Sequence, residues 1–354
     1  MVIQTITNGP SEKAGVMAGD MILSVNDTTI SGVKMAQDDI VKRLRGPRGT
    51  KANLGIKREG IDETIFIDVI RDKIPMNSVD AAFMLTAETG VVRFSNIAMT
   101  THQEVVDAIA KLKKQGMTNL ILDVTQNGGG YLQAAAQIAS EFIPRGEMVV
   151  YTKGRAYGNQ EFRSLGGDSF QEGKLIVLVD EYSASAAEIL AGAIQDHDRG
   201  LVVGRRSFGK GLVQRPVNLP DGSMIRLTIS KYYTPSGRCI QKPYEKGKEK
   251  EYRMDVINRF NSGELTNADS IHFPDSLKFQ TLKKGRTVYG GGGIMPDYFV
   301  PLDTTQNTNL YRQIVAKRIL VDANLRYLAQ NRTKIKEKYP TFEDYKKKFK
   351  VPEV

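Results

Sequence analysis

The sequence predicts an α/β fold whose central sheet is mixed and partly parallel. Two segments, 119–142 and 175–195, share the same order of an apolar strand, a loop rich in small residues and a helix. This order is typical of βα units, in which parallel strands lie side by side and their loops gather at the carboxyl ends of the strands. Those loops are therefore the first place to look for a functional site.

The chain divides into three parts by composition and periodicity. Residues 1–73 carry short apolar clusters, 74–303 carry the βα units, and 304–354 carry helical spacing with many basic residues. Within the middle part, residues 243–293 are polar and charged, which is typical of an insertion. A chain of 354 residues is long enough for two or three domains.

Hydrophobic periodicity predicts the individual elements. Predicted strands are 2–6, 21–25, 52–56, 65–70, 90–95, 119–124, 175–179, 201–203 and 224–233. Predicted helices are 34–44, 102–115, 131–142, 186–195, 309–331 and 332–349. The continuous apolar run at 175–179 favours a strand that is buried on both faces of the sheet.

Composition argues against several classes of protein. No apolar run approaches the roughly 18 residues of a membrane span. The first ten residues lack the charged-then-apolar pattern of a secretion signal, which is what we expect of a mature or trimmed form of the protein. The single cysteine, Cys239, excludes an internal disulfide and a cysteine-based zinc site. The formal net charge is +10, but acidic residues are mixed with the basic ones, and no basic stretch is interleaved with aromatic residues. This pattern predicts a solvated surface and not a nucleic-acid site.

One stretch carries the residue types of a catalytic site. The turn at 183–185 leads into the predicted helix 186–195 and puts Ser185 at the helix N-terminus, where unpaired N–H groups and the helix dipole favour negative charge. Further along, Lys210 stands between two glycines, and Gln214 follows four residues later. We interpret these three residues as a nucleophile, a base and a partner that orients the base.

Nucleotide binding is a weaker interpretation of the same stretch. Residues 204–210 fit the first half of a P-loop directly after a strand. A P-loop then needs Ser or Thr and a helix, whereas here Gly211 is followed by a strand-like run that ends at Pro216. We therefore do not expect a phosphate site.

A Ser-His-Asp triad is also weakly supported. His197 lies 12 residues beyond Ser185, which along a helix is about 18 Å away and at the wrong end. Spacing alone leaves His102 and His272 open, although the sequence has no G-x-S-x-G motif.

A serine–lysine dyad remains. A lysine accepts a serine proton only when it is largely uncharged, and burial among apolar groups such as Val203, Phe208 and Val213 would disfavour its charged form. Taken singly, Ser185 could be a helix cap, Lys210 a surface lysine and the loop 127–130 a plain turn. Their combination favours the dyad.

The N-terminal part resembles a PDZ domain. The resemblance lies in the run 9–30 and extends through 46–50. In that family a peptide C-terminus binds to a strand and a glycine-containing loop that precede the segment beginning here at Val2, so we expect the front of this domain to be missing. On that basis, substrate cleavage should depend little on the final carboxylate of the substrate.

The segments 183–188, 202–214 and 231–237 resemble the C-terminal processing peptidases, also called tail-specific proteases, and the resemblance extends to Asp297. It implies an α/β fold with a mixed-sheet protease core, a truncated N-terminal PDZ-like domain and a C-terminal helical extension. It also implies a serine endopeptidase that cleaves proteins near their C-termini through an acyl-enzyme. By this resemblance Ser185 is the nucleophile, Lys210 is the general base and Gln214 is the residue that orients the base. The oxyanion donors are the N–H of Ala186 and the N–H of Gly129 or Gly130.

Two departures from the family pattern concern the loop before the predicted helix 131–142. The family usually reads Asp-Leu-Arg and then Asn-Pro-Gly-Gly, where this chain has Thr125 in place of the arginine and Gly128 in place of the proline. The family also usually has serine at the position of Ala187. Neither departure touches the dyad.

The resemblance further implies protein or peptide substrates with apolar C-termini, no nucleic-acid partner, no cofactor and no metal. It places the protein in the bacterial cell envelope, in the periplasm. Association with a membrane and self-association stay open. The competing hypothesis is a protease-like scaffold with an idle dyad, which acts as a peptide- or protein-binding module.

Overall fold

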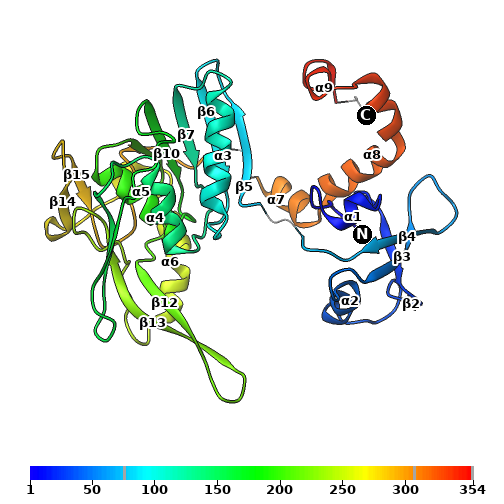
Figure 1. Cartoon of the computed structure of the whole chain (residues 1–354), viewed down its shortest axis with the longest axis horizontal. Coiled ribbons are helices and arrows are strands. Elements are labelled where there is room, and N and C mark those ends of the chain that lie inside the picture. Colours follow the sequence, from blue (N-terminus) through cyan, green and yellow to red (C-terminus); the bar gives the residue numbers. More distant parts are fainter. Residues whose placement is uncertain (75–76, 306–307, 352–354) are drawn as a thin grey trace. The chain divides into compact units, whose positions relative to one another are not determined.

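The computed structural model describes residues 1–74, 77–305 and 308–351. The chain forms two compact units. One contains residues 1–76 together with 304–354, and the other contains residues 77–303 (Figure 1). The larger unit holds all the residues predicted for the catalytic site.

A mixed sheet forms the centre of the larger unit. Its strands are β5 (Val79–Met84), β6 (Thr89–Phe94), β7 (Asn119–Asp123), β10 (Lys174–Val179), β11 (Leu201–Gly204) and β16 (Tyr298–Phe299). They lie in the order β16-β11-β10-β7-β6-β5, and every neighbouring pair is parallel except β5 with β6. The predicted mixed, partly parallel sheet is confirmed.

Three helices cover one face of this sheet: α3 (Thr101–Lys113), α4 (Leu132–Ser140) and α5 (Ala186–Asp196). Successive parallel strands step across the sheet in one direction, so right-handed crossovers bring these helices to the same side. On β10, Val177 and Val179 are buried under the helices, whereas Ile176 and Leu178 point to the other face and are half-buried. The prediction that this strand is buried on both faces is therefore wrong.

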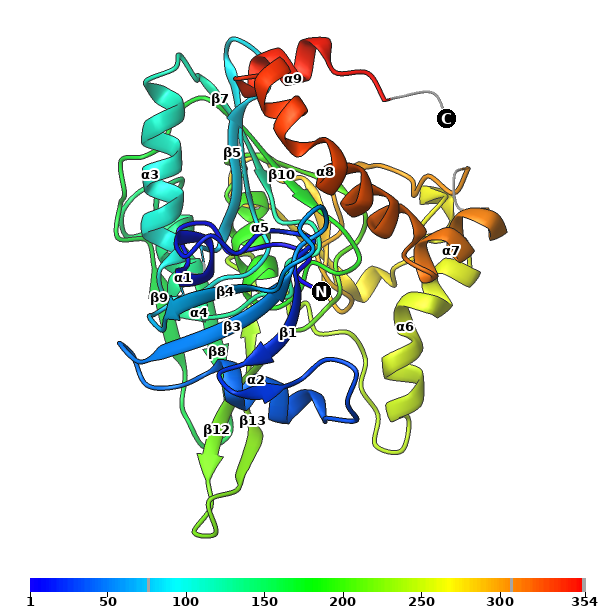
Figure 2. The same ribbon diagram turned by 90° about the vertical axis from the view of Figure 1, so that its right-hand side faces the viewer.

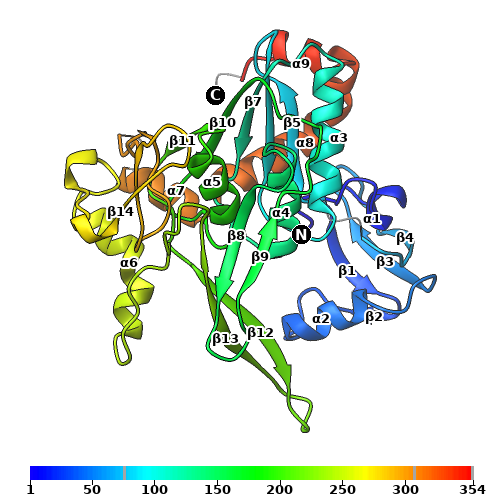
Figure 3. The same cartoon turned by 60° about the vertical axis from the view of Figure 1, so that its left-hand side comes forward.

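A second, antiparallel sheet lies beside the first. Its strands are β8 (Met148–Lys153), β9 (Gln160–Arg163), β12 (Leu212–Asn218) and β13 (Met224–Tyr233). The order is β12-β13-β8-β9, so β12 is an edge strand, and the β12–β13 hairpin projects from the unit (Figure 3). Pro216 sits within β12. A sheet tolerates proline at an edge because no neighbouring strand needs its missing N–H.

The polar segment 243–293 has ordered structure. It contains α6 (Glu249–Asn261), two 3₁₀ turns and the pair β14 (Lys278–Gln280) and β15 (Thr287–Tyr289). Arg259 of α6 is buried and donates to the backbone oxygens of Arg206 and Ser207 at 2.6 and 3.1 Å. The segment is thus attached to the chain just before Lys210.

The smaller unit contains the antiparallel sheet β2-β1-β3-β4. Its elements are α1 (Pro10–Lys13), β1 (Met21–Val25), β2 (Thr28–Thr29), α2 (Gln37–Leu44), β3 (Lys51–Lys57) and β4 (Ile65–Ile70). The strand predicted at 2–6 is wrong. Val2 exchanges hydrogen bonds with Gly19 and Asp20, but the segment forms no strand, because the rest of it has no neighbouring strand to pair with.

The C-terminal helices are α7 (Asn309–Ala316), α8 (Ile319–Lys338) and α9 (Phe342–Lys348), as Figure 2 shows. The predicted break between residues 331 and 332 is wrong, since α8 runs through it. The actual breaks come at Arg318, which has a left-handed φ of 56°, and just before Pro340. None of the helices among the described residues combines the length and the apolar content that a membrane span requires.

We predict that the larger unit depends on one buried ion pair. Arg238 and Asp196 are both fully buried, and their Nη2 and Oδ1 atoms lie 2.6 Å apart. Asp196→Ala should lower the free energy of unfolding by about 3–5 kcal/mol, because it leaves a buried guanidinium without its counter-charge. Hydrogen exchange of the α5 amides measures this loss.

Glu161→Ala is the matched control, because the Arg163–Glu161 pair is more than half exposed on both sides. Exposed ion pairs contribute little to stability. Equal destabilisation by the two variants would contradict the prediction.

Candidate active site

Ser185 lies at the junction between the β10 segment and α5, which begins at Ala186 as the sequence predicted. Its backbone has φ 58° and ψ −117°, a conformation that non-glycine residues rarely adopt. A sharp strand-to-helix turn of this kind exposes a serine hydroxyl at the top of a sheet. The sequence predicted a turn at 183–185 but not the strained backbone of Ser185, because the G-x-S-x-G motif that usually signals such a turn is absent.

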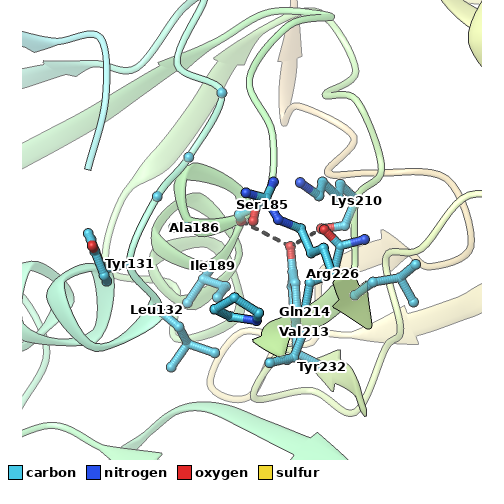
Figure 4. A pocket seen from close by; sticks show the side chains of 15 residues that line it. Tyr131, Leu132, Ser185, Ala186, Ile189, Lys210, Val213, Gln214, Arg226 and Tyr232 are labelled. Atoms are coloured by element: carbon cyan, nitrogen blue, oxygen red, sulfur yellow. Dashed lines mark hydrogen bonds between the residues drawn. The ribbon is translucent and has the colours of Figure 1, made fainter. Parts of the chain in front are cut away.

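The predicted site residues line one cavity of 560 Å³ (Figure 4). Ser185 and Lys210 are half-buried there, and Gln214 is exposed. The other lining residues are Gly128, Gly129, Gly130, Tyr131, Leu132, Ala186, Ile189, Leu212, Val213, Pro216, Arg226 and Tyr232. The fold thus brings together residues from four separate stretches of the chain, 128–132, 185–189, 210–216 and 226–232. Within the described residues, no hydrogen bond joins the Ser185 hydroxyl, the Lys210 amine and the Gln214 side chain.

The surroundings of Lys210 differ from the expectation in one respect. Val213 lines the same cavity, but the ring of Phe208 covers a different lysine, Lys242, whose Nζ lies 3.8 Å from the ring centroid. Burial lowers the pKa of the Lys242 amine, while the nearby Asp255 carboxylate acts against that shift. Lys242 also holds the glycine before Lys210, because its N–H donates to the Gly209 oxygen at 2.9 Å.

The buried carboxylate of Glu188 joins the serine and lysine segments. Its Oε2 accepts the N–H of Ser185 at 2.7 Å and the N–H of Lys210 at 2.9 Å. Its Oε1 accepts the N–H of Gly209 at 2.7 Å and the hydroxyl of Ser207 at 2.5 Å. Burial raises the pKa of this carboxyl above its ordinary value, and the four donors act against that shift. One oxygen atom thus fixes the backbone of both proposed dyad residues.

Tyr232 makes a second link between the same two residues. Its hydroxyl lies 2.9 Å from the carbonyl oxygen of Ser185 and also within hydrogen-bonding distance of the carbonyl oxygen of Lys210, as the dashed lines in Figure 4 show. Burial and the nearby Glu188 carboxylate raise the pKa of this phenol well above its ordinary value. The phenol therefore stays protonated and remains a donor.

The glycine loop packs directly against Ser185. A Cβ atom added at Gly129 would lie 2.7 Å from both the Ala186 nitrogen and the Ser185 Cβ, so only glycine fits there. The N–H of Gly129 already donates to Asn127 Oδ1 at 2.8 Å. In contrast, the N–H groups of Gly130 and Ala186 have no hydrogen-bond partner among the described residues.

Other side chains support this loop where the family pattern is absent. Asn127 is fully buried and donates to the Phe94 oxygen at 2.7 Å, which anchors the loop without a proline. Arg93 on β6 pairs with Asp123 at 3.0 Å and contacts the Thr125 hydroxyl at 3.4 Å. Thr125 stands where the family usually has arginine, and the guanidinium of Arg93 lies beside it.

The histidines that spacing left open lie outside this cavity. His102 pairs with Glu141 at 2.6 Å, and His272 lines a different pocket. His197 lies at the far end of α5, where its Nε2 is 2.6 Å from the Met148 oxygen. No histidine is among the cavity's lining residues in the described chain, so a Ser-His-Asp triad is not assembled there. The P-loop alternative also fails, because Lys210 is followed by β12 and not by a helix.

Sequence reasoning missed Glu188, Tyr232 and Arg226. Glu188 carries a usable signal, since Ser185 and Glu188 form the S-x-x-E pattern of a helix capping box. Tyr232 lies in the segment 231–237 that carries the family resemblance, but nothing in that segment points to its role. Arg226 has no such signal, because only the pairing of β13 with its neighbours brings it to the cavity.

Comparisons with known proteins identify the families that this chain resembles. Residues 88–250 match peptidase family S41, residues 1–58 match a PDZ domain, and residues 310–354 match a family of unknown function. The chain therefore contains a peptidase family S41 domain and a PDZ domain. Its resemblance to the C-terminal processing peptidases is confirmed by the relatives described next.

A carboxy-terminal-processing protease of Bartonella bacilliformis is 37% identical over 245 residues, which cover 68% of this chain and 55% of the relative. A carboxyl-terminal-processing protease of Picosynechococcus is 35% identical over 243 residues, covering 68% and 58%. A probable CtpA-like serine protease of Staphylococcus aureus is 32% identical over 295 residues, covering 82% and 57%. This chain thus spans rather more than half the length of these relatives. Among solved structures, a photosystem II D1 C-terminal processing protease matches at 32% identity with a TM-score of 0.42, covering 68% of this chain and 65% of that one.

We predict that Glu188 holds the lysine segment in place. Glu188→Ala should speed hydrogen exchange at the Gly209 and Lys210 amides by about 10-fold or more, since a hydrogen bond to a charged group contributes about 1.5–3 kcal/mol. Glu188→Gln should have a smaller effect, because it keeps one acceptor oxygen.

Exchange measured by mass spectrometry on both variants tests this prediction. The exposed Glu172→Ala variant is the control and should leave these amides protected. If Glu188→Gln and Glu188→Ala both matched the control, the carboxylate would not be holding the segment.

Proposed function

We propose that this protein is a serine endopeptidase that cleaves protein chains near their C-termini with a Ser185–Lys210 dyad. The observation that carries the proposal is the shared Glu188 oxygen, which holds the backbone of both residues beside one cavity. The peptidase family S41 match and the names of the relatives support the reaction class.

In the proposed reaction, the neutral amine of Lys210 takes the proton of the Ser185 hydroxyl. The Ser185 oxygen attacks the scissile carbonyl, and the carbonyl π electrons move to its oxygen. When the tetrahedral intermediate collapses, the C–N bond breaks and Lys210 gives the proton to the leaving amine. Water then attacks the acyl-enzyme with Lys210 again as base, which releases the acid and restores Ser185.

The negative oxygen of the intermediate needs backbone donors. We assign this role to the N–H of Ala186, at the start of α5, and to the N–H of Gly130. Gly130 is favoured over Gly129 because the Gly129 N–H already donates to Asn127. Gly129 instead permits the close approach of the loop to Ser185.

Gln214 completes the proposed site as the residue that orients Lys210. It lies on β12, in the same cavity and four residues after the lysine. Its exposed side chain has no hydrogen bond within the described chain, so we propose that substrate binding brings it onto the amine.

We propose that the substrates are proteins with apolar C-termini and that the cut lies near the C-terminus. The names of the relatives support the position of the cut. The location in the bacterial cell envelope stays a prediction, as do membrane association and self-association.

The nucleophile assignment predicts that Ser185→Ala abolishes cleavage while the protein stays folded. Loss of a serine nucleophile costs about 10⁶-fold in rate, whereas loss of one hydroxyl at a helix start costs only about 1 kcal/mol. The assay is cleavage of an unfolded protein with an apolar C-terminus, with circular dichroism as the folding control. Equal cleavage by the variant and the wild type would refute the role of Ser185. If neither cleaved while the substrate still bound, the idle-scaffold hypothesis would be favoured.

The base assignment predicts that Lys210→Arg is nearly as inactive as Lys210→Ala. Arginine keeps the charge but cannot be deprotonated, and only a neutral amine can accept the serine proton. Rates for the three proteins across a pH series test this prediction, and a near-normal rate for Lys210→Arg would show that the lysine acts only through its charge.

A further inference from the structure

The charge of the cavity is one-sided. Its lining contains two basic side chains, Lys210 and Arg226, and no Asp or Glu among the described residues. In the proposed reaction Lys210 is occupied as the base, so Arg226 is the basic side chain of the lining that is left to bind the substrate. A cavity of this kind favours a negatively charged group on whatever binds there.

Arg226 is placed at the cavity by the β12–β13 hairpin. It lies opposite Pro216 in the strand register, and both residues line the cavity. Figure 4 shows its side chain among the cavity residues together with Ser185 and Lys210. In the described part of the chain its guanidinium has no hydrogen bond or ion pair, although several other arginines of the unit are paired with carboxylates.

The neighbouring arginine of the same hairpin behaves differently. Arg215 does not line the cavity, and its guanidinium lies 5.9 Å from the ring centroid of Tyr157. The two residues share the hairpin, the charge and an exposed side chain. Only Arg226 shares a cavity with the nucleophile.

We propose that Arg226 binds a carboxylate of the substrate and so determines which bonds are cleaved. Guanidinium and carboxylate groups form paired, charge-assisted hydrogen bonds with a fixed geometry. An extended chain advances about 3.4 Å per residue, so a carboxylate held in this cavity lies within a few residues of the scissile bond. The carboxylate is either the terminal one of the substrate or an Asp or Glu side chain. This inference rests on the proposed function.

Arg226 bears on how strongly cleavage depends on the C-terminal carboxylate of the substrate. From the PDZ-like domain alone, cleavage should depend little on the final carboxylate. With Arg226 in the catalytic cavity, recognition of a carboxylate does not need that domain.

The test uses three versions of one apolar peptide that differ only in charge. The first has a free C-terminal acid close to the scissile bond, the second has a C-terminal amide, and the third has the amide and one Asp beside the scissile bond. For wild-type protein, kcat/KM should be about 10- to 100-fold higher for at least one carboxylate peptide than for the neutral amide. Preference for the first peptide alone identifies the terminal carboxylate, and preference for the third identifies a side chain.

The matched variants are Arg226→Ala, Arg226→Lys and Arg215→Ala. In Arg226→Ala the ratio of carboxylate to amide peptide should fall to about one, in Arg226→Lys it should fall part of the way, and in Arg215→Ala it should stay at the wild-type value. Salt should reduce the wild-type ratio, because the pair is open to solvent. A wild-type ratio of one, or an unchanged ratio in Arg226→Ala, would overturn the inference. So would an equal loss of rate on all three peptides in that variant, because Arg226 would then act on the dyad.

A binding measurement separates this inference from the proposed function. Fluorescence anisotropy of the labelled peptides with Ser185→Ala protein gives affinities without cleavage. Tighter binding of a carboxylate peptide that is lost when Arg226→Ala is added supports the inference even if no peptide is cut. If cleavage occurs but binding does not depend on Arg226, the proposed function stands and the inference fails.

Discussion

The site depends on one buried carboxylate. Ser185 and Lys210 come from segments that follow two neighbouring parallel strands, and nothing in the sheet itself fixes the distance between those segments. Glu188 does so by accepting the N–H groups of both residues on a single oxygen. The cost of burying an acid is offset because four donors surround it, and the buried Tyr232 hydroxyl adds a link between the same two backbones. The geometry of the proposed dyad is therefore set by the Glu188 and Tyr232 side chains, which bind the backbones of both residues, and not by a contact between the Ser185 and Lys210 side chains.

The sequence contained enough to predict the mixed sheet and the helix that begins at Ala186, because apolar periodicity and small-residue loops are local signals. It also contained the residue types that meet in the cavity. It did not contain the strained backbone of Ser185 or the place of Arg226, because these follow from strand register and from packing between distant segments. Lys242 shows the same limit, since the sequence could not tell which of two lysines Phe208 would cover.

The wrong element predictions have equally specific causes. Val2 and Ile6 have the composition of a strand, but a strand needs a partner strand. In the described part of the chain, Val2 exchanges hydrogen bonds with residues 19 and 20, whereas Ile6 accepts the N–H of Gly9 in a local turn. The C-terminal helices were divided at the wrong place because charge and periodicity continue across residue 331. The first true break depends on Arg318, a left-handed residue that has no compositional signature. The second lies just before Pro340, and proline is a local signal for the end of a helix.

The proline in β12 has a consequence for how this protein meets other chains. An edge strand beside a cavity offers free backbone groups to any extended segment, including one from another copy of the protein or from an unfolded neighbour. Pro216 has no N–H to offer, so a foreign strand cannot form an unbroken ladder along the outer side of β12. An added strand can therefore pair with β12 on only one side of Pro216 at a time, which limits the length of backbone that this edge offers to another chain.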